Sequence, residues 1–406
     1  MQTHLSTALL ATPDGETANN ILRRCVHCGF CNATCPTYQL LGDELDGPRG
    51  RIYLIKQLLE GDLEAAEGDS TRLHLDRCLT CRNCETTCPS GVEYSQLLEI
   101  GRERVEQQLP RPLPERFMRW GLRQLIPRPG RFRVMLNLGH AFSFLLPAKL
   151  KQALPPKAQA SPVWPEPQHA RRVILFEGCV QSVVATEINL AAARVLDHLG
   201  ISAWRAAGEG CCGALDQHLA AKDAAADYMR ANIDAWWPQI EQGAEAIVVT
   251  ASACGLQVKD YAHLLKDDSA YAQKAQRVSA LAKDIVEMIA AENPPASIAT
   301  QERVAFHAPC TLQHGQGLGG VVETVLSRWG FQTLAVENSH LCCGSAGTYS
   351  VLQSELSTQL RDNKLSALQA DQPAVIASAN IGCLLHLRTK AQVPVKHWVE
   401  LLAEHI

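Results

Sequence analysis

The run CVHCGFCNATCP occupies residues 25–36, and residues 78–89 repeat its spacing as CLTCRNCETTCP. Each run follows the pattern Cys-x2-Cys-x2-Cys-x3-Cys-Pro. Three thiolates at this spacing can surround one face of an iron–sulfur cluster, and the proline turns the fourth cysteine away from the other three. Because the pattern occurs twice in one chain, it indicates two [4Fe–4S] clusters and a function in electron transfer.

The fourth cysteine of each run ligates the other cluster in two-cluster ferredoxins of this spacing. We therefore expect two ligand sets: Cys25, Cys28, Cys31 and Cys88 for the first cluster, and Cys35, Cys78, Cys81 and Cys84 for the second. Zinc sites instead use separated Cys-x2-Cys pairs. Helical apolar spacing in residues 51–59 and 97–105 predicts a mainly helical region around both clusters.

The chain has 406 residues, a net charge of −4 and 16 cysteines. Its length suggests two or three domains, and its slight negative charge does not suggest a nucleic-acid partner. Residues 1–20 lack a basic stretch followed by an apolar one, and no window of 18 apolar residues occurs, so we expect neither a signal peptide nor a spanning helix. We therefore expect a cytoplasmic setting, where clustered cysteines bind metal more often than they form disulfides.

The other eight cysteines form an internal repeat. They are Cys179, Cys211, Cys212 and Cys254, followed by Cys310, Cys342, Cys343 and Cys383. In both sets the first two cysteines are 32 positions apart, each Cys-Cys pair is followed by glycine, and the closing cysteine comes 42 or 40 positions after the pair. A repeat this regular indicates that one module has been duplicated.

Each module alternates short apolar runs with helical stretches, and apolar runs end just before cysteines, as residues 172–177 do before Cys179. This alternation predicts a parallel sheet whose carboxyl edge gathers the four thiols of a module. The glycine after each Cys-Cys pair predicts a sharp bend that lets both thiols point to one site. The chemistry stays open between a further iron–sulfur cluster, another metal, a redox-active thiol pair and buried packing cysteines.

Five histidines lie near the cysteines of the second module: His307, His314, His340, His386 and His397. Each could ligate a metal, relay a proton or donate a hydrogen bond to sulfur. For any one of them taken alone, an ordinary histidine without such a role is the favoured interpretation.

We therefore predict an α+β multidomain chain. It consists of a mainly helical two-cluster ferredoxin domain (1–109), a proline-rich basic linker (110–169) and two repeated α/β Cys-Cys-Gly modules (170–300 and 301–406). Residues 107–151 carry nine Lys or Arg against one acid, with apolar residues between them. A basic amphipathic segment can bind anionic lipid or an acidic partner. Alternatively, it wraps around the chain's own core and leaves a basic face in solvent.

Several stretches show a resemblance that goes beyond cysteine spacing. They are residues 25–57 with DELDGPRGR at 43–51, residues 76–91, DAWWP at 234–238 and LCCGSAGTY at 341–349. With them the chain resembles the family that contains glycolate oxidase iron–sulfur subunits, the C subunits of anaerobic glycerol-3-phosphate dehydrogenase and the Cys-Cys-Gly subunits of heterodisulfide reductase. The resemblance covers essentially the whole chain.

The resemblance implies an electron-transfer subunit with no catalytic residue of its own. Flavin-containing partner subunits, which carry FAD, would oxidise glycolate to glyoxylate, and the electrons would pass through this chain toward a membrane acceptor such as quinone. It also implies a cytoplasmic protein that is peripheral on the inner membrane. The alternatives are the corresponding subunit for D-lactate or glycerol-3-phosphate, a thiol–disulfide reductase whose Cys-Cys-Gly modules are catalytic, and an oxygen-sensing scaffold.

The closing cysteines depart from part of this family. Members with unusual clusters in these modules close the motif with Cys-x-x-Cys, whereas here Gln257 follows Cys254 and His386 follows Cys383 at that spacing. Each module therefore has four cysteines rather than five. We expect two [4Fe–4S] clusters and leave a further Fe–S cluster or other metal in the modules open.

Overall fold

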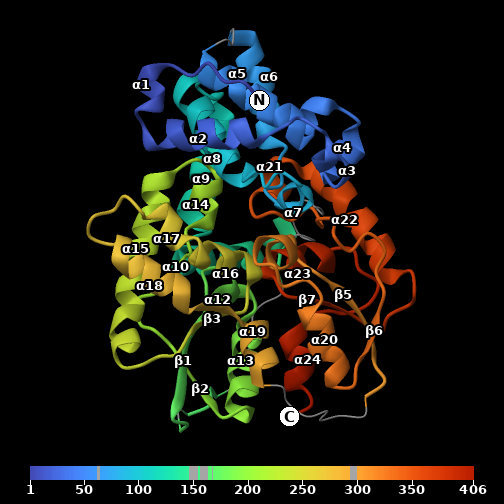
Figure 1. The fold of residues 1–406 in the computed structure, drawn as a ribbon. Helices are drawn as coiled ribbons and strands as arrows, with labels where there is room; N and C mark the ends of the chain where they lie inside the picture. The colour runs from blue at the N-terminus through green and yellow to red at the C-terminus, as the bar shows by residue number, and fades with distance from the viewer. Residues whose placement is uncertain (62–64, 146–153, 156–162, 167, 293–299) are drawn as a thin grey trace.

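The computed structural model describes residues 1–61, 65–145, 154–155, 163–166, 168–292 and 300–406. Figure 1 shows the N-terminal helices gathered at one end of the molecule, above two α/β units that lie side by side. This arrangement confirms the predicted α+β architecture.

The N-terminal region is helical, as predicted. Its elements are α1 (Thr7–Leu10), α2 (Pro13–Arg24), α3 (Phe30–Ala33), α4 (Pro36–Leu41), the 3-10 turn η1 (Glu44–Asp46), α5 (Pro48–Glu60), α6 (Ala65–Asp76), α7 (Asn83–Thr87) and α8 (Tyr94–Gln108). Helix α5 begins at Pro48 and ends before Gly61, which adopts the left-handed conformation typical of a helix end. It lies close to α8 because Gly101 has no side chain; a Cβ there would lie 2.7 Å from Ile55 Cγ1.

Two four-stranded parallel sheets follow, with strand orders β2-β1-β3-β4 and β6-β5-β7-β8. The strands are β1 (Arg171–Phe176), β2 (Ile201–Trp204), β3 (Ile247–Val249), β4 (Ala282–Asp284), β5 (Arg303–His307), β6 (Gln332–Leu334), β7 (Val375–Ser378) and β8 (Val395–His397). The predicted parallel pairing is confirmed. The edge strands β4 and β8 escape sequence analysis because Lys283 and Lys396 stand at their centres, so neither forms an apolar run.

Helices cover both sheets. Those of the first unit are α12 (Gln181–Val184), α13 (Thr186–His198), α14 (Ala214–His218), α15 (Lys222–Glu241), α16 (Ser252–Lys259), α17 (Tyr261–Leu264), α18 (Ala272–Leu281) and α19 (Ile285–Glu292). Those of the second are the π-helical turn η3 (Thr311–Gly315), α20 (Val321–Arg328), α21 (Tyr349–Leu352), α22 (Ser354–Gln369), α23 (Ile381–Arg388) and α24 (Trp398–Ala403).

The two units share one core, in which buried residues of β1 and β5 belong to a single apolar cluster. Hydrogen bonds also join the chain just beyond the carboxyl ends of their strands. The Ser252 N–H donates to Ala379 O at 3.0 Å, and His397 Nε2 lies 2.9 Å from Thr250 O. The edges that carry the cysteines are thereby held next to each other.

The basic linker contains two helices, α9 (Leu113–Leu125) and α10 (Pro129–Ala141), followed by the short turn η2 (Ser143–Leu145). Lys149 and Lys151, which contribute to the basic character of the linker, lie outside the described residues. None of the described helices is long and apolar enough to cross a membrane.

Candidate metal centres

Two neighbouring cavities lie between α5, α7 and α8. The first is lined by Cys25, Cys28, Cys31 and Cys88, and the second by Cys35, Cys78, Cys81 and Cys84. Cys84 also borders the first cavity, so the two share a wall. The structure thus brings each predicted set of four thiols to a cavity of its own.

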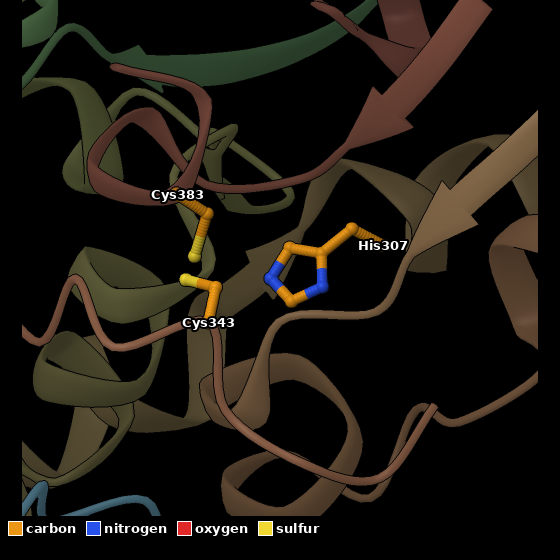
Figure 2. A group of neighbouring side chains, drawn as sticks. All are labelled: His307, Cys343 and Cys383. Atoms are coloured by element: carbon orange, nitrogen blue, oxygen red, sulfur yellow. The ribbon is translucent and has the colours of Figure 1, made fainter. Parts of the chain in front are cut away.

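The thiols of these cavities are spaced for a cluster rather than for one ion. Among the described residues, three or more ligand atoms of Cys, His, Asp or Glu lie within 4.8 Å of one another at two places, and neither includes these eight cysteines. One of the two places is in the second α/β unit (Figure 2). A tetrahedral zinc ion needs ligand atoms about 3.3–3.8 Å apart, whereas thiols that hold a cluster are separated by the cluster itself. The cavities therefore fit an iron–sulfur group.

The backbone bends sharply where the cysteine runs surround the cavities. Gly29 has a φ of +86°, and the non-glycine residues His27, Thr80 and Arg82 have φ values of +60°, +54° and +58°. Such left-handed conformations are costly for residues with a side chain and cluster at functional sites. Glycine adopts such a conformation without strain, and no sequence signal indicates the other three.

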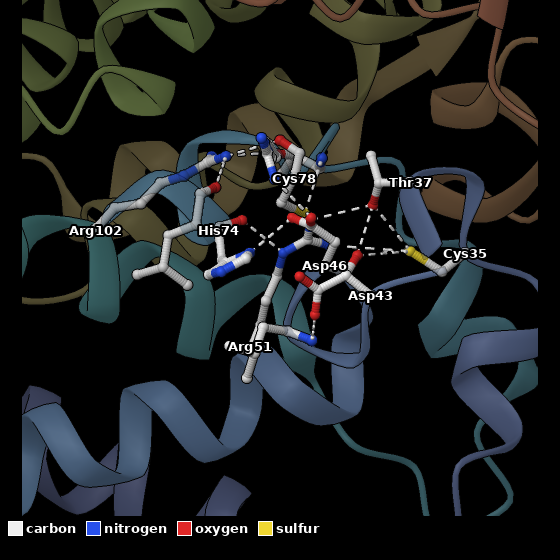
Figure 3. A network of polar contacts seen from close by, with 12 residues as sticks. Cys35, Thr37, Asp43, Asp46, Arg51, His74, Cys78 and Arg102 are labelled. Carbon is white, nitrogen blue, oxygen red and sulfur yellow. Dashed lines mark hydrogen bonds and ion pairs between the residues drawn. The ribbon is translucent and has the colours of Figure 1, made fainter. Parts of the chain in front are cut away.

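A buried ionic network lies beside the second cavity (Figure 3). Arg51 is 1% exposed; its Nη1 donates to Cys35 Sγ at 3.9 Å and its Nη2 to Thr37 Oγ1 at 3.1 Å. Nη2 also lies 3.5 Å from the carboxylate of Asp46, which in turn accepts from Arg77 at 2.8 Å. The sequence gives no sign that these residues form a buried network, although the stretch at 43–51 contains both Asp46 and Arg51.

The network keeps a positive charge next to sulfur. Burial alone would raise the pKa of Asp46, but the His74 hydrogen bond and the charges of His74, Arg51 and Arg77 hold it below its usual range. In the first cavity, burial raises the pKa of the Cys31 thiol to about 11. Burial also raises the pKa of Cys81 and Cys84 in the second cavity. Both cavities therefore hold desolvated thiols, and the second adds a buried guanidinium beside Cys35.

Each α/β unit gathers its own thiols next to the bend at its Cys-Cys-Gly sequence. The N–H of Gly213 donates to Cys211 Sγ, and that of Gly344 donates to Cys342 Sγ, both at 3.4 Å. The two glycines have φ values of +91° and +86°. A Cβ on Gly344 would lie 2.7 Å from Ser357 O, so the predicted need for glycine is confirmed.

The sulfur contacts differ between the units. In the first, hydrogen bonds from Cys211 and Cys254 lower the pKa of the Cys212 thiol. In the second, Cys310 Sγ lies 3.9 Å from Cys342 Sγ, and that contact together with burial raises the pKa of Cys310. The duplicated pattern therefore does not give two identical sites.

Of the five histidines near the second set of cysteines, His307 is the one that has a ring nitrogen close to two cysteine sulfurs. It lies with Cys343 and Cys383, and the three ligand atoms are all within 4.8 Å of one another (Figure 2). Three of the other rings form hydrogen bonds elsewhere: His314 to Thr86 and His340 O, His386 to Ser357, and His397 to Thr250 O.

The helical region contacts both α/β units through residues beside its cysteines. Arg82 forms an ion pair with Asp260 at 2.6 Å in the first unit, and Thr86 Oγ1 lies 3.1 Å from His314 Nδ1 in the second. Cys81 and Cys310 pack against one apolar cluster that includes Cys342. The second cavity therefore lies next to the thiols of the second unit.

These features define an iron–sulfur protein with one helical cluster-binding region and two cysteine-rich units. The family model for a 4Fe-4S dicluster domain matches residues 21–92. The model for a cysteine-rich domain matches twice, at residues 173–259 and 304–388. Both matches agree with the ferredoxin runs and with the duplicated module read from the sequence.

Three curated relatives indicate which family of iron–sulfur proteins this chain resembles. The glycolate oxidase iron–sulfur subunit of Escherichia coli is 53% identical over 100% of this chain and 99% of its own length. A Bacillus subtilis protein named "Probable glycolate oxidase iron-sulfur subunit" is 30% identical over 94% of each chain. Lactate utilization protein A of Bacillus subtilis is 27% identical over 57% of this chain and 98% of its own. The chain belongs to the family of glycolate oxidase iron–sulfur subunits, which confirms the resemblance.

Proposed function

We propose that this chain transfers electrons within a glycolate-oxidising complex and that its two cavities hold one [4Fe–4S] cluster each. The observation that carries the proposal is the pair of adjoining cavities, each lined by one predicted set of thiols. The proposed ligands are Cys25, Cys28, Cys31 and Cys88 in the first cavity, and Cys35, Cys78, Cys81 and Cys84 in the second. When bound, the clusters supply one-electron transfer between a flavin and an acceptor.

Glycolate is proposed as the substrate of the complex because the 53% identical relative is a glycolate oxidase subunit. We assign FAD and substrate oxidation to partner subunits, since the 53% identical relative is named as the iron–sulfur subunit of glycolate oxidase. The name of the lactate utilization relative makes D-lactate the second candidate.

The flavin partner is proposed to dock at the first cavity. Cys28 is the exposed member of its thiol set, and the neighbouring apolar residues Val26 and Phe30 are also exposed. A partner covering these two side chains would exclude water from the cavity mouth and bring its flavin close. Arg51, beside the second cavity, favours added negative charge there.

We propose that α9 and α10 rest on the membrane surface, because α9 carries its apolar side outward. Its arginines on the inner side, Arg119 and Arg123, form ion pairs with Asp76 and Asp216. About 100° around the helix axis from these arginines lie Leu113, Phe117 and Trp120, with exposed fractions of 76%, 72% and 54%. The exposed surface of α9 therefore combines these apolar side chains with Arg116.

The charge of this surface is complementary to anionic lipid. Residues 110–145 contain seven arginines and one acid, Glu115, which is paired with Arg111. Arg116 and Arg133 are exposed, and further exposed apolar side chains follow on α10 and beyond it: Val134, Leu138, Phe142 and Phe144. Aromatic residues at a bilayer interface together with arginines at phosphate give peripheral binding.

Vesicle binding tests this surface with the full chain. We expect binding to phosphatidylglycerol-containing vesicles and little to pure phosphatidylcholine. Arg116→Glu with Arg133→Glu should weaken binding at least tenfold, because each basic residue near an anionic surface contributes about 1 kcal/mol. Val351→Ser with Lys266→Glu, an exposed pair elsewhere, is the control. Equal binding by the α9–α10 variant would contradict the assignment.

Substrate addition tests the electron-transfer proposal. The complex would be purified without oxygen and given glycolate, D-lactate or glycerol-3-phosphate, while electron paramagnetic resonance follows the clusters and absorbance follows the flavin. We expect glycolate to reduce both. Cluster reduction by D-lactate or glycerol-3-phosphate alone would assign the chain to that substrate instead. Intact clusters that no substrate reduces would favour thiol chemistry in the Cys-Cys-Gly modules.

A further inference from the structure

His307 is a buried histidine without a hydrogen-bond partner in the described structure. It is the last residue of β5 and is 1% exposed, and neither ring nitrogen is bonded. Figure 2 shows its ring facing the sulfurs of Cys343 and Cys383, which come from the Cys-Cys-Gly bend and from α23. An unsatisfied buried nitrogen is costly, so its position beside two thiols indicates a ligand between them.

The first unit carries a different residue at the same place. An offset of 131 positions relates Cys179 to Cys310 and each member of one Cys-Cys pair to the other pair. The same offset relates His307 to Phe176, the last residue of β1. Phe176 is buried and packs edge-to-face on Trp236, with ring centroids 5.2 Å apart. The duplicated units thus place an apolar ring in one and a potential ligand in the other.

We propose that the second Cys-Cys-Gly module binds one thiophilic divalent metal ion, of the Zn²⁺ type, through His307, Cys343 and Cys383, and that the first module lacks this site. The three ligand atoms lie within 4.8 Å of one another, as a single ion requires and a cluster does not. Cys342 lies outside this group, since its sulfur contacts that of Cys310 at 3.9 Å. The fourth position is thus open to water. Binding through Cys343 and Cys383 releases two thiol protons, so the ion's charge is balanced by two thiolates.

The surroundings support this ligand set. Both ring nitrogens of His307 are buried without a partner among the described residues and are therefore available to ligate. Asn380 Nδ2 donates to Cys383 Sγ at 3.5 Å. The buried Lys364, whose Nζ donates to Asn338 O at 2.7 Å, adds positive charge near the sulfurs. Such outer contacts orient metal ligands and stabilise thiolates.

Metal counting on the native complex tests the proposal independently of its activity. We expect about eight iron atoms per chain from the two cubanes and about one further ion. His307→Phe, which introduces the residue of the first unit, should lose that one ion and keep the iron. With cobalt supplied during expression, the wild type should show thiolate-to-cobalt charge transfer and tetrahedral d–d bands, and His307→Phe should not.

Two further variants keep the result interpretable. His307→Cys should retain the ion with a shifted cobalt spectrum, because it restores a ligand. His314→Phe should retain it unchanged, because that ring bonds Thr86 and a backbone carbonyl. Cubane signals in electron paramagnetic resonance report folding. Retention of the ion by His307→Phe would overturn the proposal, and so would loss of about four irons, which would indicate a cluster in place of one ion.

Discussion

Replacing Arg51 with glutamine should make the cluster of the second cavity harder to reduce. Arg51 is buried, and its guanidinium donates to Cys35 Sγ at 3.9 Å. The reduced cluster carries one more negative charge than the oxidised one, so a nearby cation stabilises the reduced form. Glutamine keeps hydrogen-bonding ability but removes the charge, and the reduction potential should therefore fall.

The size of the shift follows from the distance. Two unit charges 3.9 Å apart attract by about 4 kcal/mol at an effective dielectric constant of about 20. The added electron spreads over the cluster, and Asp46 offsets part of the charge of Arg51. About a third of the full value remains, or ~1.4 kcal/mol, which corresponds to about 60 mV for a one-electron couple.

A redox titration followed by electron paramagnetic resonance measures this potential. Arg51→Lys, which keeps the charge, should change it little, and Asp46→Asn should raise it. Arg49→Gln at the first cavity is the matched control, since it removes a guanidinium that does not line the second cavity. If Arg51→Gln and Asp46→Asn shift the potential in the same direction with both clusters present, the electrostatic reasoning is refuted.

Three other changes have defined outcomes. Cys28→Ser should lose one cluster and most acceptor reduction while the partner flavin is still reduced by substrate; unchanged acceptor reduction would contradict the electron path. Gly344→Ala should destabilise the fold by about 3 kcal/mol, because its φ is +86° and a Cβ would lie 2.7 Å from a backbone oxygen of α22. Gly317→Ala, at φ +69° with open space, should cost about 1 kcal/mol in the same thermal melts. Burial raises the pKa of Asp284 to about 7 against about 3.9 in an unfolded chain, so its contribution to stability is lost as pH rises from about 4 to 7. Asp284→Asn should flatten that dependence and raise stability at pH 8 by up to about 4 kcal/mol, whereas the exposed control Asp371→Asn should not.

Local sequence determined the parts of this protein that depend on short-range chemistry. The Cys-x2-Cys-x2-Cys-x3-Cys-Pro runs identify cluster binding because a cluster needs thiolates at that spacing. The repeat revealed the duplicated unit. Apolar runs before cysteines predicted parallel strands, and the parallel pairing of β1 with β3 and of β5 with β7 confirms them. The strands β4 and β8 escaped because their pairing depends on neighbours rather than on their own residues.

Tertiary structure alone decided which charged groups meet. Asp46 and Arg51 are five positions apart, but His74 and Arg77 reach the same carboxylate from α6 and the residue after it. The sequence offered no sign that this carboxylate would be buried. Nor did it single out His307 from the other four histidines, because only the fold brings its ring to Cys343 and Cys383.

Helix α9 shows the same division. Its periodicity predicts one apolar and one basic side, but a period cannot say which side faces inward. Arg119 and Arg123 form ion pairs with Asp76 of α6 and Asp216 of α14, and the apolar side chains of Leu113, Phe117 and Trp120 remain exposed. The sequence by itself predicted the two thiol sets and determined the repeat, since both follow from spacing along the chain. The orientation of α9, the charge beside Cys35 and the ring beside Cys343 were decided only in three dimensions, because each depends on partners distant in the chain.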